Sequence, residues 1–530
     1  MNSETPHLTQ PEMHPQRWGD PARATALPDT ARGLVDLVFG TRETPAAAAV
    51  TLPETGLATE HVAALGDLVG ADHVLVDAQT RRQRTRGKST PDLLRARAGD
   101  VDDAPDVVVR PTTHEEVAAV LTYAVEHHLA VVPFGGGTAV TGGLVARREG
   151  FGGVVSLDLV RMKRLLAVDE VSMTATLEPG LRGPEAEALL AAHGLTLGHH
   201  PQSFEFASIG GFAATRSSGQ SSAGFGRFDS MVVGLRAATP VGELRWGVAP
   251  ATAAGPDLRQ VLLGSEGAFG VITEVTVRVR RAAAQTSYEG WRWPSFAEGA
   301  QAMRTLAQAQ LLPTVIRLSD EAETAINLAD PSAIGGEGAS GCLMVVGHEG
   351  TAEQVAARGA AVAAVLTGLG GTPLGAEPGE SWVHGRYNAP YLRDSLLDVG
   401  VLVETLETAT FWSQIPTLYD GVRTTLSEGL GEGSIVLCHI SHVYETGCSL
   451  YFTVAAKGSE DPLPQWLAVK DAVGDAIVAH GGTITHHHAI GTDHKPWLAA
   501  EVGEVGVAVL RGLKASFDPT GILNPGVLVP

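Results

Sequence analysis

Short apolar blocks, rich in valine and bounded by proline or glycine, recur in the first half of the chain. Blocks of this length predict buried strands, and they extend over residues 106–111, 129–134 and 153–158. After the first block, Thr113 and Glu116 have the spacing of a helical capping box, and apolar residues at helical spacing continue to His128. The order of strand, helix and strand predicts a βαβ-like unit.

Alternating apolar and polar residues follow this unit. They predict half-buried strands over 171–178 and 271–279, with a helix over 184–193 between them. The alternation ends near Arg281, where we expect the first large unit to close.

After residue 281 the predicted strands and helices follow one another in a different order from that of the first unit. The expected elements are strands over 291–293, 314–318 and 343–348 and helices over 296–309 and 351–368. Two further apolar blocks, 434–442 and 447–454, are separated by a short turn and predict an antiparallel hairpin. The chain is therefore expected to be an α+β protein.

Four regions result from these patterns: 1–100, with helices near 30–39 and 61–70, then 101–281, 282–480 and 481–530. In the first region, residues 81–88 form a basic cluster, for which we expect an exposed loop because charged runs are commonly solvated. Contact with an anionic ligand or a membrane surface is the alternative. Two glycine-containing segments, 219–229 and 331–341, are expected to be mobile loops.

Composition narrows the class of protein. The 530 residues are 44% hydrophobic and 18% charged, which is typical of a globular protein with two or three domains. A net charge of −21 argues against general nucleic-acid binding. The cysteines Cys342, Cys438 and Cys448 lack CxxC spacing and indicate reduced thiols. With no long apolar run and no signal-like start, we expect a cytoplasmic protein.

The clearest chemical signal is the glycine loop after the strand at 129–134. Bare glycines let backbone N–H groups approach a phosphate, although such a turn can also merely bend the chain. The loop opens no helix in the GxGxxG manner of dinucleotide-binding folds. Further motifs follow at 199–203 with 209–211, at 263–273 and at 518–526. Together they resemble the flavin-binding domain of the vanillyl-alcohol oxidase/p-cresol methylhydroxylase superfamily.

This resemblance implies an FAD enzyme. It makes 101–281 a two-subdomain FAD-binding domain, 282–480 an α+β cap with an antiparallel sheet, and 481–530 a segment that returns to the flavin. The implied FAD-binding residues are Pro133, Phe134, Gly135, Gly136, Gly137, Thr138, Ala139, Gln202, Ser203, Ser208, Gly210, Gly211, Thr215, Arg216, Ser217, Ser218, Glu266, Gly267, Ala268, Phe269, Gly270, Val271 and Ile272. Because the glycine loop holds no histidine or cysteine that could tether the flavin, we expect FAD to bind non-covalently.

A run of three histidines, His486, His487 and His488, is the next candidate. It could be a surface turn or a metal site, since imidazole is a common metal ligand. Adjacent side chains of an extended chain alternate faces, so three consecutive ligands are hard to assemble. We therefore expect no metal, and expect proton transfer and charge stabilisation beside the flavin.

The run, the preceding Gly481 and Gly482, and a C-terminal Asp-Pro turn resemble one family, the alkyldihydroxyacetonephosphate synthases. The resemblance implies a catalytic Tyr451, in the segment 447–452, and a functional Arg317. It also implies that Arg393 clamps the substrate phosphate, a task that suits a guanidinium fork.

Each role has a structural alternative. Tyr451 could be a core aromatic, and Arg317 and Arg393 could pair with Asp320 and Asp394. Glu266 could be a carboxylate at a helix N-terminus that satisfies backbone donors.

The resemblance implies exchange of the acyl group of acyl-dihydroxyacetone phosphate for a fatty alcohol, a step of ether-lipid synthesis. The segment after His488 departs from the family pattern, and residues 521–526 look more like flavin-dependent 2-hydroxyacid dehydrogenases. The alternative is therefore an FAD dehydrogenase or oxidase of a 2-hydroxy acid. We expect a lipid-like small-molecule substrate and a homodimer, and leave a peripheral membrane contact open.

Overall fold

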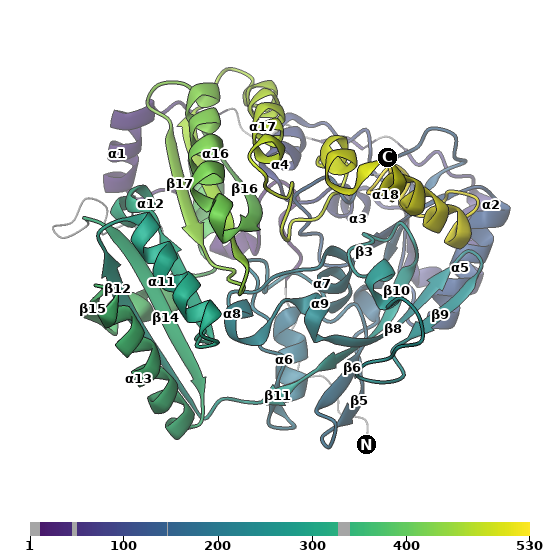
Figure 1. The fold of residues 1–530 in the computed structure, drawn as a ribbon. Helices are drawn as coiled ribbons and strands as arrows, with labels where there is room; N and C mark the ends of the chain where they lie inside the picture. The colour runs from purple at the N-terminus through teal and green to yellow at the C-terminus, as the bar shows by residue number, and fades with distance from the viewer. Residues whose placement is uncertain (1–10, 45–49, 53, 146, 327–339) are drawn as a thin grey trace.

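The computed structural model describes residues 11–44, 50–52, 54–145, 147–326 and 340–530. Most of the segment 331–341, expected to be a mobile loop, lies outside the described residues. The ribbon shows the large sheet and its helices at the left and the elements of the two smaller sheets at the right (Figure 1).

The first sheet confirms the predicted βαβ-like start. Its strand order is β1-β2-β4-β3, and β2, β4 and β3 are parallel. Its elements are β1 (Val74–Leu75), β2 (Val107–Val109), β3 (Ala130–Phe134) and β4 (Val154–Asp158), with helices α2 (Thr59–Val69) and α5 (His114–Glu126). The three parallel strands read as nearly continuous apolar runs because they are buried on both faces.

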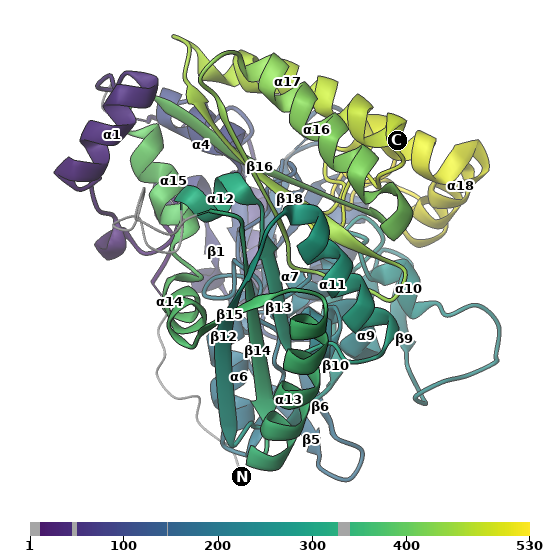
Figure 2. The ribbon, with the colours of Figure 1, turned by 60° about the vertical axis from the view of Figure 1, so that its left-hand side comes forward.

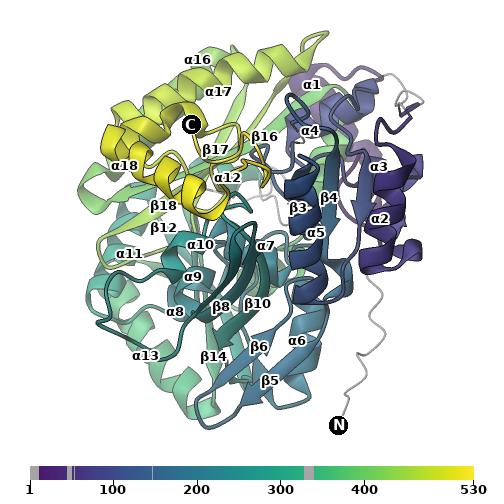
Figure 3. The same ribbon diagram turned by 90° about the vertical axis from the view of Figure 1, so that its right-hand side faces the viewer.

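The second sheet is antiparallel, in the order β5-β6-β10-β8-β9. Its strands are β5 (Leu165–Asp169), β6 (Thr174–Leu177), β8 (Val232–Thr239), β9 (Gly242–Trp246) and β10 (Val271–Arg278). The short helices nearby are α6 (Gly183–Ala191), α7 (Ile209–Thr215), α8 (Ser222–Phe225), α9 (Phe228–Met231) and α10 (Arg259–Leu262), and a two-stranded ribbon joins β7 (Leu195–Thr196) to β11 (Arg280–Arg281). Helix α5 of the first unit lies beside β8 of this second sheet (Figure 3).

The third sheet has seven antiparallel strands in the order β15-β12-β14-β13-β17-β18-β16. The strands are β12 (Gln285–Trp293), β13 (Val315–Ser319), β14 (Cys342–Gly350), β15 (Thr372–Gly375), β16 (Val401–Phe411), β17 (Ile435–Ile440) and β18 (Gly447–Lys457). The hairpin predicted from the apolar blocks is confirmed, because β17 pairs antiparallel with β18.

Helices cover one face of this sheet (Figure 2). They are α11 (Phe296–Gln308), α13 (Ala352–Gly368), α16 (Ile415–Leu430) and α17 (Pro462–Ala479). On β18, Leu450, Phe452 and Val454 point into this helical core, whereas Tyr451 and Thr453 line a cavity on the opposite face. Successive side chains of a strand point to opposite faces, so those of β18 alternate between the core and the cavity lining.

The remaining helices close the ends of the molecule. They are α1 (Asp29–Phe39), α3 (Ala78–Gln83), α4 (Thr90–Ala98), α12 (Glu321–Ile326), α14 (Glu377–Gly385), α15 (Ala389–Leu397) and α18 (Lys495–Phe517). After α18 the chain returns to β3, where Leu523 forms a parallel bridge with Val131. We propose that the four regions drawn from the sequence are the structural units of the protein.

The basic cluster at 81–88 is not the exposed loop that was expected. It begins in α3, and Arg81, Arg84 and Lys88 are buried. The carboxylates of Asp158 and Glu12 each lie 2.9 Å from the Arg84 guanidinium. These partners come from distant parts of the sequence, so local composition could not reveal them. The segment 219–229, also expected to be a mobile loop, contains α8 and the start of α9 and buries Phe228.

Candidate active site

A cavity of about 530 Å³ brings together three groups of residues. The first is the glycine loop after β3. The second is a set of polar side chains from the large sheet and the histidine run, including Arg317, Tyr451 and His487. The third is a set of apolar side chains from α1, from α15 and from Leu27 just before α1, namely Leu27, Ala31, Leu34, Val35, Val38, Leu392 and Leu396.

The glycine loop fits a phosphate-bearing cofactor. Gly135, Gly136 and Gly137 line the cavity, and a Cβ added at Gly136 would collide with the carbonyl oxygen of Phe206. Gly137 has a φ of +70°, a conformation that side chains disfavour. Without side chains the loop keeps its backbone exposed to the cavity, as a pyrophosphate requires.

Most of the predicted FAD-binding residues line this cavity. Three of them lie outside its lining. Arg216 is ion-paired with Asp229 at 3.5 Å, while Ala268 and Phe269 are buried in the core of the second sheet. Among the predicted catalytic and substrate-binding residues, Arg317, Arg393, Tyr451, His487 and His488 line the cavity and His486 lies behind its wall.

Glu266 joins the cofactor turn to the C-terminal segment. Its carboxylate accepts hydrogen bonds from the backbone N–H groups of Ile490 (3.0 Å) and Gly491 (2.9 Å). Burial raises the pKa of Glu266 to about 7. The Asn524 side-chain amide donates to the Glu266 carbonyl at 2.6 Å and so fastens the same turn. Glu266 therefore does satisfy backbone donors, but these donors lie just after the histidine run and not at a helix N-terminus.

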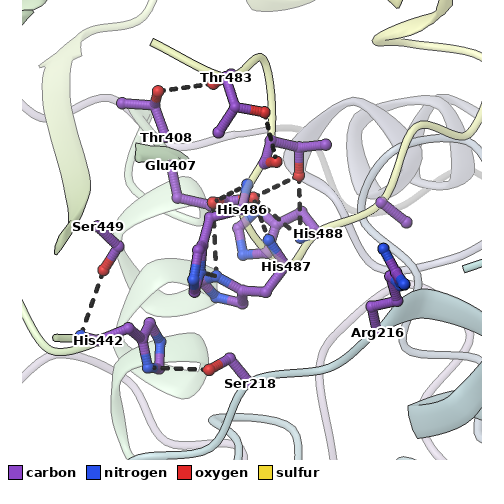
Figure 4. A network of polar contacts seen from close by, with 12 residues as sticks. Arg216, Ser218, Glu407, Thr408, His442, Ser449, Thr483, His486, His487 and His488 are labelled. Atoms are coloured by element: carbon purple, nitrogen blue, oxygen red, sulfur yellow. Dashed lines mark hydrogen bonds and ion pairs between the residues drawn. The ribbon is translucent and has the colours of Figure 1, made fainter. Parts of the chain in front are cut away.

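The histidine run is folded around one buried carboxylate (Figure 4). Glu407 of β16 accepts hydrogen bonds from the backbone N–H groups of His486 (2.7 Å), His487 (3.1 Å) and His488 (2.9 Å). The Thr485 hydroxyl donates to it at 2.6 Å. Burial alone would raise the pKa of Glu407, but the attraction of His487 and its neighbours holds that pKa well below its usual range. The turn therefore rests on a carboxylate that stays ionised.

Burial has the opposite effect on the imidazoles. It lowers the pKa of His488 to about 3 and moves the pKa values of His486 and His442 well below their usual range. These rings are neutral near pH 7, and a neutral imidazole offers one hydrogen-bond donor and one hydrogen-bond acceptor.

Tyr451 lies opposite Glu407 in the pairing of β16 with β18. Its ring stacks on His439 with centroids 4.8 Å apart, and burial raises its pKa to about 12. Arg317 of β13 donates to Glu323 at 2.5 Å and to His439 Nδ1 at 3.0 Å. Arg317 thus pairs with Glu323 and not with the Asp320 that the sequence offered.

Arg393 of α15 also faces the cavity. Its guanidinium lies 3.1 Å from the Asp394 carboxylate, the pair that the sequence suggested, and donates to the Lys88 carbonyl at 2.7 Å. The side chain of Lys88 lines the same cavity, and burial lowers its pKa to about 8. The cavity lining therefore includes two cationic side chains, Lys88 and Arg393, together with the apolar side chains of α15.

Several residues of the site were assigned no role of their own from the sequence: Lys88, Glu323, Glu407, His439, His442 and Tyr444. Two histidines at the end of the predicted strand 434–442, His439 and His442, were an available signal. Nitrogen atoms of His442, His486 and His487 lie within 4.8 Å of one another, a grouping compact enough for a metal ion. The expectation of no metal stays a prediction.

Comparison with known proteins agrees with this geometry. The family described as FAD binding domain matches residues 105–247, and the family described as FAD linked oxidases, C-terminal domain, matches residues 282–528. The protein is thus an FAD-dependent enzyme. None of the helices in the described part of the chain is long and apolar enough to cross a membrane.

The alkyldihydroxyacetonephosphate synthase of Trypanosoma brucei brucei is 34% identical over 509 residues, covering 90% of this chain and 82% of that protein. A solved structure of an alkyldihydroxyacetonephosphate synthase has a TM-score of 0.82 at 30% identity, over 97% of this chain and 98% of that one. Substrate-bound p-cresol methylhydroxylase, with a TM-score of 0.72 at 17% identity over 90% of this chain and 98% of that one, shares the fold. The chain belongs to the alkyldihydroxyacetonephosphate synthase family.

Proposed function

We propose that this enzyme exchanges the acyl group of acyl-dihydroxyacetone phosphate for a long-chain alcohol. The observation that carries the proposal is the composition of the cavity. Its lining includes the glycine loop, the cations Arg317 and Arg393, and the apolar side chains of α1 and α15. An anionic head beside a long alkyl chain needs all of these surfaces, whereas a small hydroxy acid needs no apolar strip. The dehydrogenase alternative is therefore less well supported.

The reaction requires one substitution at carbon. The bond between the dihydroxyacetone carbon and the acyl oxygen breaks, and a bond from that carbon to the alcohol oxygen forms. The carboxylate leaves as an anion and the alcohol loses its proton, so one proton is released in each turnover near pH 7. There is no net oxidation. When bound at the glycine loop, FAD would supply an electron-accepting ring system.

The side chains of the cavity have separate tasks in this proposal. Arg393 binds the phosphate, with Lys88 adding positive charge, and Arg317 orients the reacting centre. Tyr451, held neutral by its raised pKa of about 12, gives or accepts a proton through its hydroxyl. His487 and His488 assist proton transfer, and Glu407 positions them by accepting hydrogen bonds from their backbone N–H groups.

Access of the lipid involves α1. Its side chains Leu34 and Val38 line the cavity and are also 47% and 51% exposed, and Leu37 is 83% exposed. We place the peripheral membrane contact at this helix, because the basic cluster suggested by the sequence is buried. Sedimentation with phosphatidylcholine vesicles should fall when Leu37 is changed to Asp. The homodimer stays a prediction that light scattering can test.

The test of the proposed function uses the purified flavin-loaded enzyme with palmitoyl-dihydroxyacetone phosphate and hexadecanol. Mass spectrometry should detect hexadecyl-dihydroxyacetone phosphate and an equal amount of palmitate. Palmitate without ether would show only hydrolysis and would refute the proposal. Bleaching of the flavin by 2-hydroxy acids would instead support the dehydrogenase alternative.

A further inference from the structure

Tyr444 lies at the end of a row of hydrogen bonds that begins in the cavity. His487 Nδ1 is 3.0 Å from His486 Nδ1, and His486 Nε2 is 2.5 Å from the Tyr444 hydroxyl. Both distances are within hydrogen-bonding range. His487 lines the cavity, whereas His486 and Tyr444 are outside its lining. The row of hydrogen bonds therefore extends from the cavity lining to residues behind that lining.

The residue at the outer end of the row lies near the surface of the molecule. Tyr444 is half-buried in the turn between β17 and β18, and its neighbours Glu445 and Thr446 are exposed. His486, by contrast, is only 7% exposed. Arg227 donates to the His486 carbonyl at 3.0 Å and fixes the middle of the row.

The contact between two Nδ1 atoms restricts the positions of protons. One nitrogen must donate and the other must accept. His487 Nδ1 also lies 3.4 Å from the Glu407 carboxylate, which favours the proton on His487. His486 then accepts at Nδ1 and donates from Nε2 to the Tyr444 oxygen. His487 Nε2 is left as an acceptor.

We propose that His486 and Tyr444 are a proton relay that connects His487 in the cavity with solvent at the β17–β18 turn. A proton that arrives at His487 Nε2 displaces the Nδ1 proton toward His486. His486 passes its Nε2 proton to the Tyr444 oxygen, and the Tyr444 hydroxyl proton moves to water. One proton enters and one leaves, both imidazoles end in the other neutral tautomer, and the reverse sequence restores them.

The relay rests on the proposed function, which releases one proton per turnover into a cavity that holds a lipid. The pKa of Tyr444 is raised to about 12, chiefly by burial. A phenol with that pKa does not store a negative charge at pH 7, and the proton must pass through it in a connected series of transfers. The Tyr444 hydroxyl is thus required as a link, and phenylalanine cannot replace it.

The experiment compares Tyr444→Phe with the wild-type holoenzyme in the ether-forming assay. Tyr419→Phe is the matched control, because Tyr419 is a half-buried tyrosine of the same region whose hydroxyl donates to Asp320 outside the cavity lining. We expect kcat of Tyr444→Phe to fall by at least about tenfold, less than the 10²–10⁴ typical of a directly acting base. Its KM for the phosphate substrate and its flavin content should be unchanged.

Two further readouts separate a relay from a structural role. In Tyr444→Phe the solvent deuterium isotope effect on kcat should increase, and added imidazole should restore turnover in proportion to its concentration. Wild-type turnover with an unchanged isotope effect, or a slow variant that imidazole does not rescue, would overturn the relay while leaving ether formation by the wild type intact. Absence of ether from the wild type would refute the proposed function itself, and with it the proton that the relay carries.

Discussion

Replacing Glu407 by glutamine should loosen the turn that holds the three histidines. The carboxylate accepts hydrogen bonds from three successive backbone N–H groups and from the Thr485 hydroxyl. Glutamine offers one acceptor oxygen and one NH₂ group in the same space. With its oxygen at the Oε1 position it still serves His487, His488 and Thr485. The His486 N–H then faces another donor.

The cost can be worked out from these contacts. An unsatisfied buried N–H group costs about 1–3 kcal/mol. The hydrogen bonds that remain are no longer charge-assisted, which weakens each by about 1 kcal/mol. The Glu407 side chain is 0% exposed, so water cannot replace the lost partner. A local loss of at least about 3 kcal/mol is expected, which corresponds to about a hundredfold change in an opening equilibrium.

Amide hydrogen exchange measures this opening directly. In Glu407→Gln the peptide that contains His486–His488 should lose protection by about a hundredfold at pH 7. Glu501→Gln is the matched control, since Glu501 accepts from the Ile484 N–H at 3.1 Å but is exposed. Its replacement should change protection by less than about fivefold, equivalent to 1 kcal/mol.

The pH dependence of the Glu407 effect has a defined sign. The folded pKa lies well below the usual value, and the unfolded pKa is about 4.3. The stabilisation by the carboxylate is therefore complete above the unfolded pKa and is lost as pH falls through the folded pKa. The difference between wild type and variant should be constant from about pH 6 to 8 and shrink below about pH 4. Equal protection of the two proteins at pH 7 would refute the assigned role of the carboxylate.

Three other changes test separate parts of the site. Gly136→Ala places a Cβ against the Phe206 carbonyl and should reduce the amount of bound flavin, measured by the ratio of absorbance at about 450 and 280 nm. Gly512→Ala is the control, because its Cβ meets open space and should leave the flavin content unchanged. The raised folded pKa of Glu266 makes the contribution of this side chain to wild-type stability fall as pH rises from about 4.3 to 7. The stability of Glu266→Gln relative to the wild type should therefore increase over that interval. The same difference in urea midpoint between the two proteins at about pH 5 and at about pH 8 would contradict this. Arg393→Met should raise KM for the phosphate substrate by about 10- to 100-fold, from the loss of a charged hydrogen bond worth about 1.5–3 kcal/mol, and leave KM for the alcohol unchanged.

Elements with a strong local pattern could be predicted from the sequence. The valine-rich runs predict β2, β3 and β4, and the capping residues and apolar spacing predict α5. The observed bounds of these elements agree with the predicted ones to within two residues at each end. The strand expected over 171–178 is shorter, because Val171–Met173 form a turn in which Asp169 accepts from the backbone N–H groups of Val171 and Ser172. A side-chain acceptor of this kind competes with strand pairing.

The supports of the site could not be predicted in the same way. Glu407 and the histidine run are joined by hydrogen bonds across nearly eighty residues of sequence, 79 between Glu407 and His486. The sequence predicts an exposed basic cluster, because its carboxylate partners, such as Asp158, belong to another element and cannot be recognised from the local sequence. Tyr444 belongs to no sequence motif, and only its short distance to His486 in the structure indicates a role for it. Long-range pairing of polar groups, and not the hydrophobic pattern, determines these positions.

The most direct test of the central claim is the fate of the alcohol oxygen. Hexadecanol labelled with ¹⁸O is incubated with the holoenzyme and palmitoyl-dihydroxyacetone phosphate, and the products are separated by mass spectrometry. If the bond between the dihydroxyacetone carbon and the acyl oxygen breaks, the ether retains the label and the released palmitate is unlabelled. Label in a palmitate ester, or an ether without label, would contradict substitution at that carbon and with it the proposed use of the cavity.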